Sequence, residues 1–204
     1  MHIVRHALQL YPDAVAEQEQ CVAQIVAGTA GSTLILTEHP PVFTIGTSGK
    51  MGDVKSRIVD GDMIEVYPTG RGGEVTYHGP GQLLCYVVAD LRRDKNLHQH
   101  VWRLEEMVIV TLQHFGIVAA RSSRGIGVWV DGLKIAAVGV RCRKWVAFHG
   151  VSLNISPNLK HYQGIVPCGM ADAPVTSMAA LGRTVLRREV ESVVQDAASQ
   201  LFVV

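Results

Sequence analysis

The stretch Thr69-Gly-Arg-Gly-Gly-Glu-Val-Thr-Tyr-His-Gly-Pro-Gly-Gln82 is the feature around which the rest of the sequence is organised. Five of its fourteen residues are glycine. Glycine permits positive φ angles and lets the backbone approach a ligand closely, so this density suggests a pocket walled by backbone. Polar side chains lie between the glycines, namely Arg71, Thr76, Tyr77, His78 and Gln82. Tight turns between strands are the alternative, but two glycine clusters around so few β-prone residues favour a binding site.

Strand-like patterns flank the glycine-rich stretch on both sides. Residues 64–67 lead into it, and the nearly continuous apolar run at 83–88 that follows is typical of a buried strand, with Cys85 in the core. Earlier in the chain, residues 33–37 and 42–45 have the composition of short strands. The glycine-rich stretch is therefore expected to connect elements of a sheet.

A hairpin is predicted further along the chain. Asp131-Gly132 is a strong signal for a two-residue turn, and it lies between strand-like segments at 125–130 and 133–140. A further strand is predicted at 145–155. Consecutive strands joined in this way pair antiparallel.

Helical periodicity is the signal for the remaining elements. Apolar residues recur at helical spacing in residues 12–28, 97–115 and 186–202, and Pro12 is well placed to open the first of these helices. Residues 175–181 are also predicted to be helical. Residues 158–172 are predicted to form an irregular loop, and its length makes a functional role plausible on physical grounds.

Together these patterns predict an α/β protein of the α+β type, with a mixed, largely antiparallel β-sheet packed with helices. No shift in composition marks a linker, so residues 1–204 are expected to form a single domain. With 48% hydrophobic residues the chain can bury a sizeable core.

Charge and cysteine content exclude several classes of function. A net charge of +1 and a pI near 7.8 imply no general attraction to nucleic acid or to an anionic membrane. No apolar run approaches the ~18 residues that span a bilayer, and residues 1–8 contain no signal-peptide pattern. The four cysteines are irregularly spaced and include no C-x-x-C pair, so neither a disulfide framework nor a metal site is predicted. A cytoplasmic protein with free thiols is expected.

The four cysteines are candidates for a nucleophile. Cys168 lies between a proline and a glycine inside the predicted long loop, where a side chain is presented rather than packed. Cys142 has basic neighbours, which lower a thiol pKa, but in a strand it shares a face with Val140 and is interpreted as core. Cys21 has no chemical neighbours in sequence. Cys168 is the favoured candidate.

A cysteine nucleophile needs a group that holds it as thiolate and moves protons. His78 and His149 both lie next to glycine and are candidates, although a histidine satisfied in the core is an equally good interpretation. Lys134 follows the predicted hairpin turn and begins a strand of small residues, where a buried lysine would be costly unless paired or functional. Taken alone, an exposed lysine at a strand end is the simpler interpretation.

Six motifs taken in order resemble the lipoyl(octanoyl) transferase family, the octanoyl-[acyl-carrier-protein]:protein N-octanoyltransferases of lipoate biosynthesis. They are Gly70-Arg-Gly-Gly-Glu-Val-Thr-Tyr-His-Gly-Pro-Gly-Gln82, Gly127-Val-Trp-Val130, Lys134-Ile-Ala-Ala-Val-Gly139, His149-Gly-Val-Ser-Leu-Asn154, Pro167-Cys-Gly169 and Val175-Thr-Ser177. They span most of the chain, and the combination is highly specific. Ser152 is a small departure, because the family more often has alanine there.

The resemblance implies a fold like the catalytic domain of biotin and lipoate protein ligases. It implies that Cys168 is the acyl-thioester nucleophile and that Lys134 lowers the pKa of this thiol and moves protons. The substrate-binding residues that it implies are Arg71, Gly72, Gly73, Glu74, Val75, Thr76, Tyr77, His78, Ala137, Val138, Gly139, His149, Gly150, Val151 and Ser152. The preference for Lys134 over the histidines comes from the family alone.

The resemblance also implies the partners. Octanoyl-acyl carrier protein would be the donor, and the lipoyl domains of 2-oxoacid dehydrogenases and the glycine cleavage H protein would be the acceptors. The donor thioester is already activated, so no cofactor and no ATP are expected, and the chain is expected to act as a monomer. Two other classes stay open at this point. An ATP-dependent lipoate or biotin ligase needs no nucleophilic cysteine, and a non-catalytic carrier-protein binding module would need neither Cys168 nor Lys134.

Overall fold

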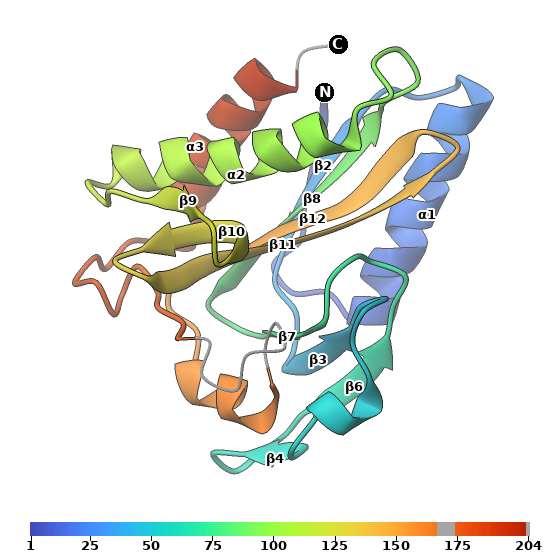
Figure 1. The fold of residues 1–204 in the computed structure, drawn as a ribbon. Helices are drawn as coiled ribbons and strands as arrows, with labels where there is room; N and C mark the ends of the chain where they lie inside the picture. Colours follow the sequence, from blue (N-terminus) through green and yellow to red (C-terminus); the bar gives the residue numbers. More distant parts are fainter. Residues whose placement is uncertain (167–173, 203–204) are drawn as a thin grey trace.

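A large mixed sheet runs through the molecule, and the computed structural model describes it within residues 1–166 and 174–202 (Figure 1). The sheet has seven strands in the order β1-β2-β8-β12-β11-β10-β9. β1 pairs parallel with β2, and the other neighbouring strands of this sheet pair antiparallel. The strands are β1 (His2–Arg5), β2 (Thr33–Thr37), β8 (Gln82–Asp90), β9 (Ala120–Ser122), β10 (Gly125–Val130), β11 (Leu133–Arg143) and β12 (Val146–Asn154).

Two smaller sheets lie below the large one in Figure 1. The first has the order β6-β3-β7, and the second is a short ribbon of β4 and β5. The first of these sheets packs on a separate hydrophobic core. The large side chains of this core include Phe43, Tyr77 and Tyr162. The elements of this part are β3 (Val42–Ile45), η1 (Met51–Asp53), β4 (Ile58–Val59), β5 (Asp62–Met63), β6 (Glu65–Pro68), β7 (Val75–His78) and η2 (Leu159–Gly164).

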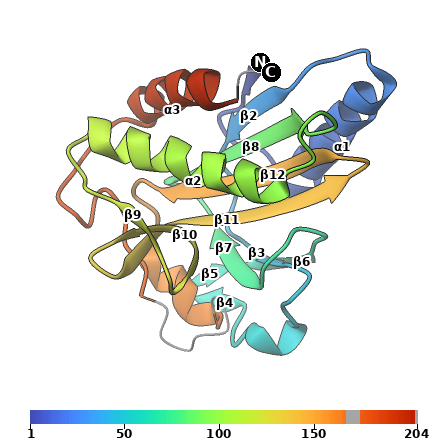
Figure 2. The same ribbon diagram turned by 45° about the horizontal axis from the view of Figure 1, so that its top comes forward.

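In the part of the chain that the structure describes, three α-helices cover the two faces of the large sheet. α1 (Tyr11–Ala27) packs on one face, whereas α2 (Leu97–His114) and α3 (Arg187–Leu201) lie side by side on the other (Figure 2). β8 explains this division, because successive side chains of a strand point to opposite faces. Leu83, Cys85 and Val87 join the core under α2 and α3, while Leu84, Tyr86 and Val88 pack against α1.

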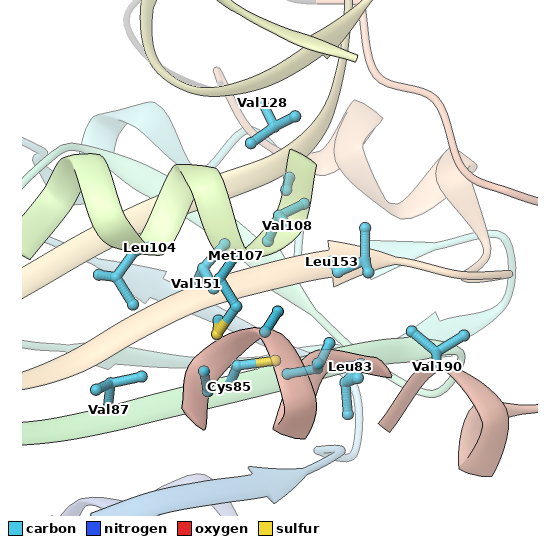
Figure 3. Packing of buried hydrophobic residues seen from close by; sticks show 14 of the residues in the cluster. Leu83, Cys85, Val87, Leu104, Met107, Val108, Val128, Val151, Leu153 and Val190 are labelled. Atoms are coloured by element: carbon cyan, nitrogen blue, oxygen red, sulfur yellow. The ribbon is translucent and has the colours of Figure 1, made fainter. Parts of the chain in front are cut away.

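The larger core fills the space between the sheet and the pair α2 and α3. Figure 3 shows side chains of α2, among them Leu104 and Met107, next to strand residues such as Cys85 and Val151. These four side chains are at most 2% exposed. Burial of apolar area at about 25 cal/mol per Å² is what holds helices and sheet together.

Local signals set several element boundaries. Pro12 occupies the first turn of α1, and Gly28 ends the helix with a φ of 75°, a left-handed conformation suited to glycine. The side chain of Asn96 caps α2 by accepting a hydrogen bond from the backbone N–H of Gln99. Asp131 and Gly132 have φ values of 47° and 79°, the geometry of a tight turn between β10 and β11.

The predicted fold class is confirmed, and most predicted elements lie where the sequence indicated. The helix predicted at 175–181 is wrong. Val175 instead forms a bridge with Lys134, whose N–H donates to Pro174 O while its carbonyl accepts from Thr176 N–H, and a turn over residues 178–182 follows. The backbone groups of Pro174 and Thr176 therefore pair with Lys134 on the sheet, and they are not available for hydrogen bonds within a helix. The predicted loop at 158–172 contains η2, and its last residues lie outside the described part of the chain.

Within residues 1–166 and 174–202 no helix combines the length and the apolar character needed to cross a membrane.

Candidate active site

A cavity of about 360 Å³ opens between the glycine-rich loop and the middle of the large sheet. The predicted site residues that line it are Arg71, Gly72, Gly73, Glu74, Val75, Thr76, His78, Lys134, Ala137, Val138, Gly139, His149, Gly150, Val151 and Ser152. They come from the loop before β7, from β7 itself and from the paired strands β11 and β12. Segments far apart in the sequence thus form one wall, because Ala137 pairs with Ser152 and Gly139 with Gly150.

Arg71 is built into the wall of the cavity. It is 8% exposed, and its guanidinium donates to Thr44 O at 2.6 Å, to Glu74 O at 2.8 Å and to Gly72 O at 3.0 Å. A Cβ atom at Gly139 on the opposite strand would lie 3.1 Å from Arg71 Cδ. Arg71 thus fixes the shape of the glycine-rich loop, and glycine across from it leaves the side chain room.

A chain of buried hydrogen bonds starts at His78. Its Nδ1 lies 2.6 Å from Gln82 Oε1, and Gln82 Nε2 donates to Asn154 Oδ1 at 2.8 Å and to the Tyr162 hydroxyl at 3.1 Å. Because Gln82 uses its nitrogen as donor, its oxygen accepts, so Nδ1 of His78 carries the proton. Asn154 Nδ2 donates in turn to Thr176 O at 2.9 Å. The chain connects the glycine-rich loop to the segment that borders Lys134.

His149 lies within β12 and lines the cavity. Its φ is 62°, a left-handed conformation that is uncommon for a residue with a side chain. Its N–H donates to Gln18 Oε1 of α1 at 2.8 Å, and Gln18 is fully buried. Such local departures from strand geometry re-aim a side chain and occur next to active sites. Gln18 therefore supports the backbone that presents His149.

Lys134 is buried at 7% exposure, which excludes an exposed lysine at a strand end. Its ammonium donates to Ile126 O at 3.2 Å and lies 4.8 Å from the centroid of the Trp129 ring. Gly127 has a φ of 131°, and a Cβ atom there would lie 3.3 Å from Lys134 Cε. The motif Gly127-Val-Trp-Val130 thus leaves room for the lysine stem and supplies an aromatic face for its charge.

The histidines of the site are neutral at physiological pH. Burial lowers the pKa of His78 to about 3 and the pKa values of His39 and His149 to about 4. The positive charge of Arg71 lowers the pKa values of His78 and His149 further. A base is most effective when its pKa is near the working pH, so these rings suit hydrogen bonding better than proton transfer.

Tyr77 and Cys168 remain from the predicted site residues. Tyr77 points away from the cavity, because it alternates with Thr76 and His78 on β7, and its hydroxyl lies 2.7 Å from His161 Nδ1. Cys168 lies outside the described residues. Burial raises the pKa of the Cys21, Cys85 and Cys142 thiols, so none of these three is activated as a nucleophile.

Comparison with known proteins identifies the family. Residues 11–199 match the family model described as lipoyl protein ligase A/B catalytic domain. The octanoyltransferase of Magnetococcus marinus is 45% identical over 201 residues, which cover 98% of this chain and 92% of that protein. The octanoyltransferase of Paramagnetospirillum magneticum is 44% identical, over 94% of this chain and 92% of that protein. The chain belongs to the octanoyltransferase family. It is therefore an acyltransferase, as the sequence motifs implied.

Solved structures place this octanoyltransferase-family chain on a ligase-like fold. Lipoate-protein ligase A bound with ATP has a TM-score of 0.72 at 15% identity, covering 98% of this chain and 85% of that one. The bi-partite lipoate protein ligase from Thermoplasma acidophilum gives 0.72 at 16% identity, with 98% and 83% covered. The biotin protein ligase from Aquifex aeolicus gives 0.61 at 14% identity, with 98% and 70% covered. At these identities the likeness concerns the fold alone.

Several residues of the site were not found by reading the sequence of this octanoyltransferase-family member, and three of them hold or present large side chains. Tyr11 and Tyr86 line the cavity, and Gln18 supports His149. Gln18 and Tyr86 left a weak signal, and Tyr11 left none. Gln18 is a polar residue on the apolar face of α1, four positions before buried Val22, and Tyr86 carries the one hydroxyl in the apolar run at 83–88. A polar group in a pattern that is otherwise buried marks a residue with a tertiary partner.

Proposed function

We propose that this chain transfers the octanoyl group from octanoyl-acyl carrier protein to a lysine of lipoyl domains, through a thioester on Cys168. The observation that carries the proposal is the burial of Lys134 in the wall of the cavity. Burial of an ammonium costs free energy, and here the charge is held beside an aromatic ring and a carbonyl oxygen. Relatives that are 44% and 45% identical are named octanoyltransferases, which indicates that the transferred acyl group is octanoyl.

The first half-reaction is a thioester exchange. The Cys168 thiolate attacks the carbonyl carbon of the donor thioester, a new C–S bond forms, and the carrier thiolate leaves after the tetrahedral intermediate collapses. The leaving carrier thiolate takes up a proton from the Lys134 ammonium, which is left neutral for the second half-reaction. A lysine ammonium near the sulfur favours the thiolate form of Cys168 by charge attraction. Because one thioester replaces another, the step is close to balanced in free energy and requires no ATP.

The second half-reaction forms the amide. The neutral ε-amine of the acceptor lysine attacks the Cys168 thioester, the C–N bond forms, and the cysteine thiolate is released. The neutral form of Lys134 accepts the proton that the incoming amine loses. An amide is more stable than a thioester, so this step gives the transfer its direction.

The cavity walls supply the binding. In this proposal Arg71, the glycines beside it and His78 form one side of the acyl-binding pocket, and residues 137–139 and 149–152 form the other. The described walls are largely apolar or backbone, which suits a medium-length acyl chain. Tyr77 then contributes by packing behind the wall, since its ring stacks edge-on against Phe43 and Tyr162.

The partners follow from the same proposal. Acyl carrier protein would present the donor, and the lipoyl domains of 2-oxoacid dehydrogenases and the glycine cleavage H protein would provide acceptor lysines. Residues 1–204 would act as one catalytic domain, as a monomer, in the cytoplasm.

The test is an intact-mass measurement. The protein is mixed with octanoyl-acyl carrier protein without ATP, for the wild type, Cys168→Ala and Lys134→Met. We expect the wild type to gain an octanoyl adduct that hydroxylamine removes, and Cys168→Ala to gain none. Lys134→Met should form the adduct at least about 100-fold more slowly, because loss of an acid–base group costs about 10²- to 10⁴-fold in rate. Addition of a lipoyl domain should then discharge the adduct.

The rival functions give different results. An ATP-dependent lipoate–protein ligase would modify the lipoyl domain only when ATP and free octanoate are present, and Cys168→Ala would keep that activity. A non-catalytic binding module would hold the carrier protein equally well in all three proteins and acylate no lipoyl domain. Either result would refute the thioester route.

A further inference from the structure

Glu105 is a buried carboxylate that the proposed mechanism does not use. It lies on α2, which packs over β10 (Figure 1), and it is 7% exposed. Its Oε2 accepts a hydrogen bond from Arg121 Nε of β9 at 2.9 Å, and Arg121 also pairs with Glu106 at 2.8 Å. The guanidinium lies 4.5 Å from the centroid of the Trp102 ring. Burying a charge costs free energy unless the charge is paired, so Arg121 offsets part of the cost of burying Glu105.

The second oxygen of Glu105 reaches the strand beside Lys134. Glu105 Oε1 accepts a hydrogen bond from the Gly127 N–H at 2.9 Å. The register between β10 and β9 slips at this point, so that residues 126–128 of β10 lie opposite a single residue of β9. Extra residues in a bulge of this kind are left without a ladder partner. The carboxylate thus bonds an N–H that would otherwise lack a partner in the sheet.

The peptide group between Ile126 and Gly127 is held from two sides. Its N–H donates to the Glu105 carboxylate, and its carbonyl accepts from the Lys134 ammonium at 3.2 Å. In a trans peptide these two groups point in opposite directions, so the peptide lies between a carboxylate and an ammonium. Gly127 has a φ of 131°, a conformation suited to glycine, and glycine leaves the backbone free to rotate. The carboxylate therefore fixes the orientation that presents the carbonyl to the lysine.

We propose that Glu105 is a positioning residue for Lys134 and acts on it through the Ile126–Gly127 peptide. The inference rests on the proposed function, in which Lys134 exchanges a proton with the carrier thiolate and with the acceptor amine. Both the ammonium and the neutral amine carry N–H groups, so the bond to Ile126 O holds the nitrogen in place through both half-reactions. Without Glu105 the peptide is free to turn, and Lys134 loses this anchor. A displacement of about 1 Å near reacting groups can cost about 100-fold in rate.

The variant Glu105→Met tests the inference, since methionine keeps the length of the side chain and removes both acceptor oxygens. Adduct formation from octanoyl-acyl carrier protein is followed by intact mass, in the wild-type background and in Lys134→Met. We expect Glu105→Met to slow adduct formation by about 10- to 100-fold in the first background. In the second background the slowing should be less than about 2-fold, because a residue that acts through Lys134 has no effect once the lysine is gone. Glu105→Gln keeps one oxygen for the Gly127 N–H, so its loss should be smaller and again confined to the first background.

Glu106→Met is the matched control. Glu106 is the next residue on the same helix, and its replacement removes one carboxylate partner of Arg121, as Glu105→Met does, but leaves the Gly127 N–H bonded. Its adduct rate should stay as in the wild type. A second measurement does not depend on the transfer reaction. Acetylation of Lys134 by acetic anhydride, followed by peptide mass spectrometry, should be faster in Glu105→Met than in the wild type or in Glu106→Met.

The possible outcomes separate this inference from the proposed function. An equal slowing by Glu105→Met in both backgrounds overturns the inference, because it would show that Glu105 holds the fold rather than the lysine. An unchanged rate in the wild-type background overturns it as well. In either case a normal octanoyl adduct on the wild type would leave the transferase standing. If the wild type forms no adduct, the proposed function is refuted, and equal acetylation of Lys134 in all three proteins would then overturn the anchoring by Glu105 too.

Discussion

Replacing Gln18 with methionine should weaken the protein at the point where α1 supports the active-site wall. Methionine has a similar length and volume, so the core keeps its packing. What is lost is the acceptor for the His149 N–H, now 2.8 Å from Gln18 Oε1, together with the hydrogen bond that Gln18 Nε2 donates to Ala14 O at 3.1 Å. A buried donor without a partner costs about 1–3 kcal/mol. The left-handed φ of His149 costs about 1–2 kcal/mol in the wild type too, so it adds nothing to the loss but favours relaxation of this backbone once the bond is gone. We therefore expect a loss of about 1–3 kcal/mol, with His149 free to leave its position.

Urea unfolding followed by circular dichroism measures this loss as a lower midpoint at an unchanged slope. Gln20→Met on the same helix is the control, because Gln20 is exposed and its replacement should change stability by less than about 0.5 kcal/mol. Octanoate binding should weaken in Gln18→Met and remain normal in Gln20→Met. Equal stability of the two variants would show that the contact between Gln18 and His149 does not hold the wall, and the reasoning from the strained backbone would be refuted.

Two further predictions concern the sheet and acid stability. Gly150→Ala would place a Cβ atom 2.1 Å from Cys85 O on the neighbouring strand, so it should destabilise by at least about 2 kcal/mol, whereas Gly31→Ala has open space and should be neutral in the same urea assay. Because burial lowers the pKa values of His39 and His78 below the unfolded value of about 6.5, the unfolded chain binds more protons; stability should be complete above pH 6.5 and fall toward pH 4. A thermal midpoint that stays level or rises between pH 6.5 and pH 4 would contradict these pKa directions.

Local spacing was sufficient to predict most of the fold. The helix at 97–115 and the turn at Asp131-Gly132 were predicted to within one residue, because side-chain periodicity and turn chemistry act between neighbours in sequence. The helix predicted at 175–181 failed for the opposite reason. Its residues have helical spacing, but Lys134 and Asn154, which are distant in sequence, bind its backbone in an extended form.

The site was predicted unevenly. Motifs identified the segments that meet at the cavity, and strand pairing brings Gly139 opposite Gly150 as one wall. The direction of individual side chains was less accessible. Tyr77 lies within the motif but points away from the cavity, since alternation along β7 follows from which face is covered. Tyr11 lies outside every motif, yet it lines the cavity.

The sequence alone determined the family, the order of most elements and the set of segments that carry chemistry. All of these are properties of residue type and local spacing. Only the tertiary structure decided that Lys134 is buried against Trp129, that the site histidines are neutral, and that Gln18 reaches His149, 131 positions away. The physical reason is that burial, pKa and backbone strain depend on which distant groups surround a residue, and these are fixed only when the chain closes on itself.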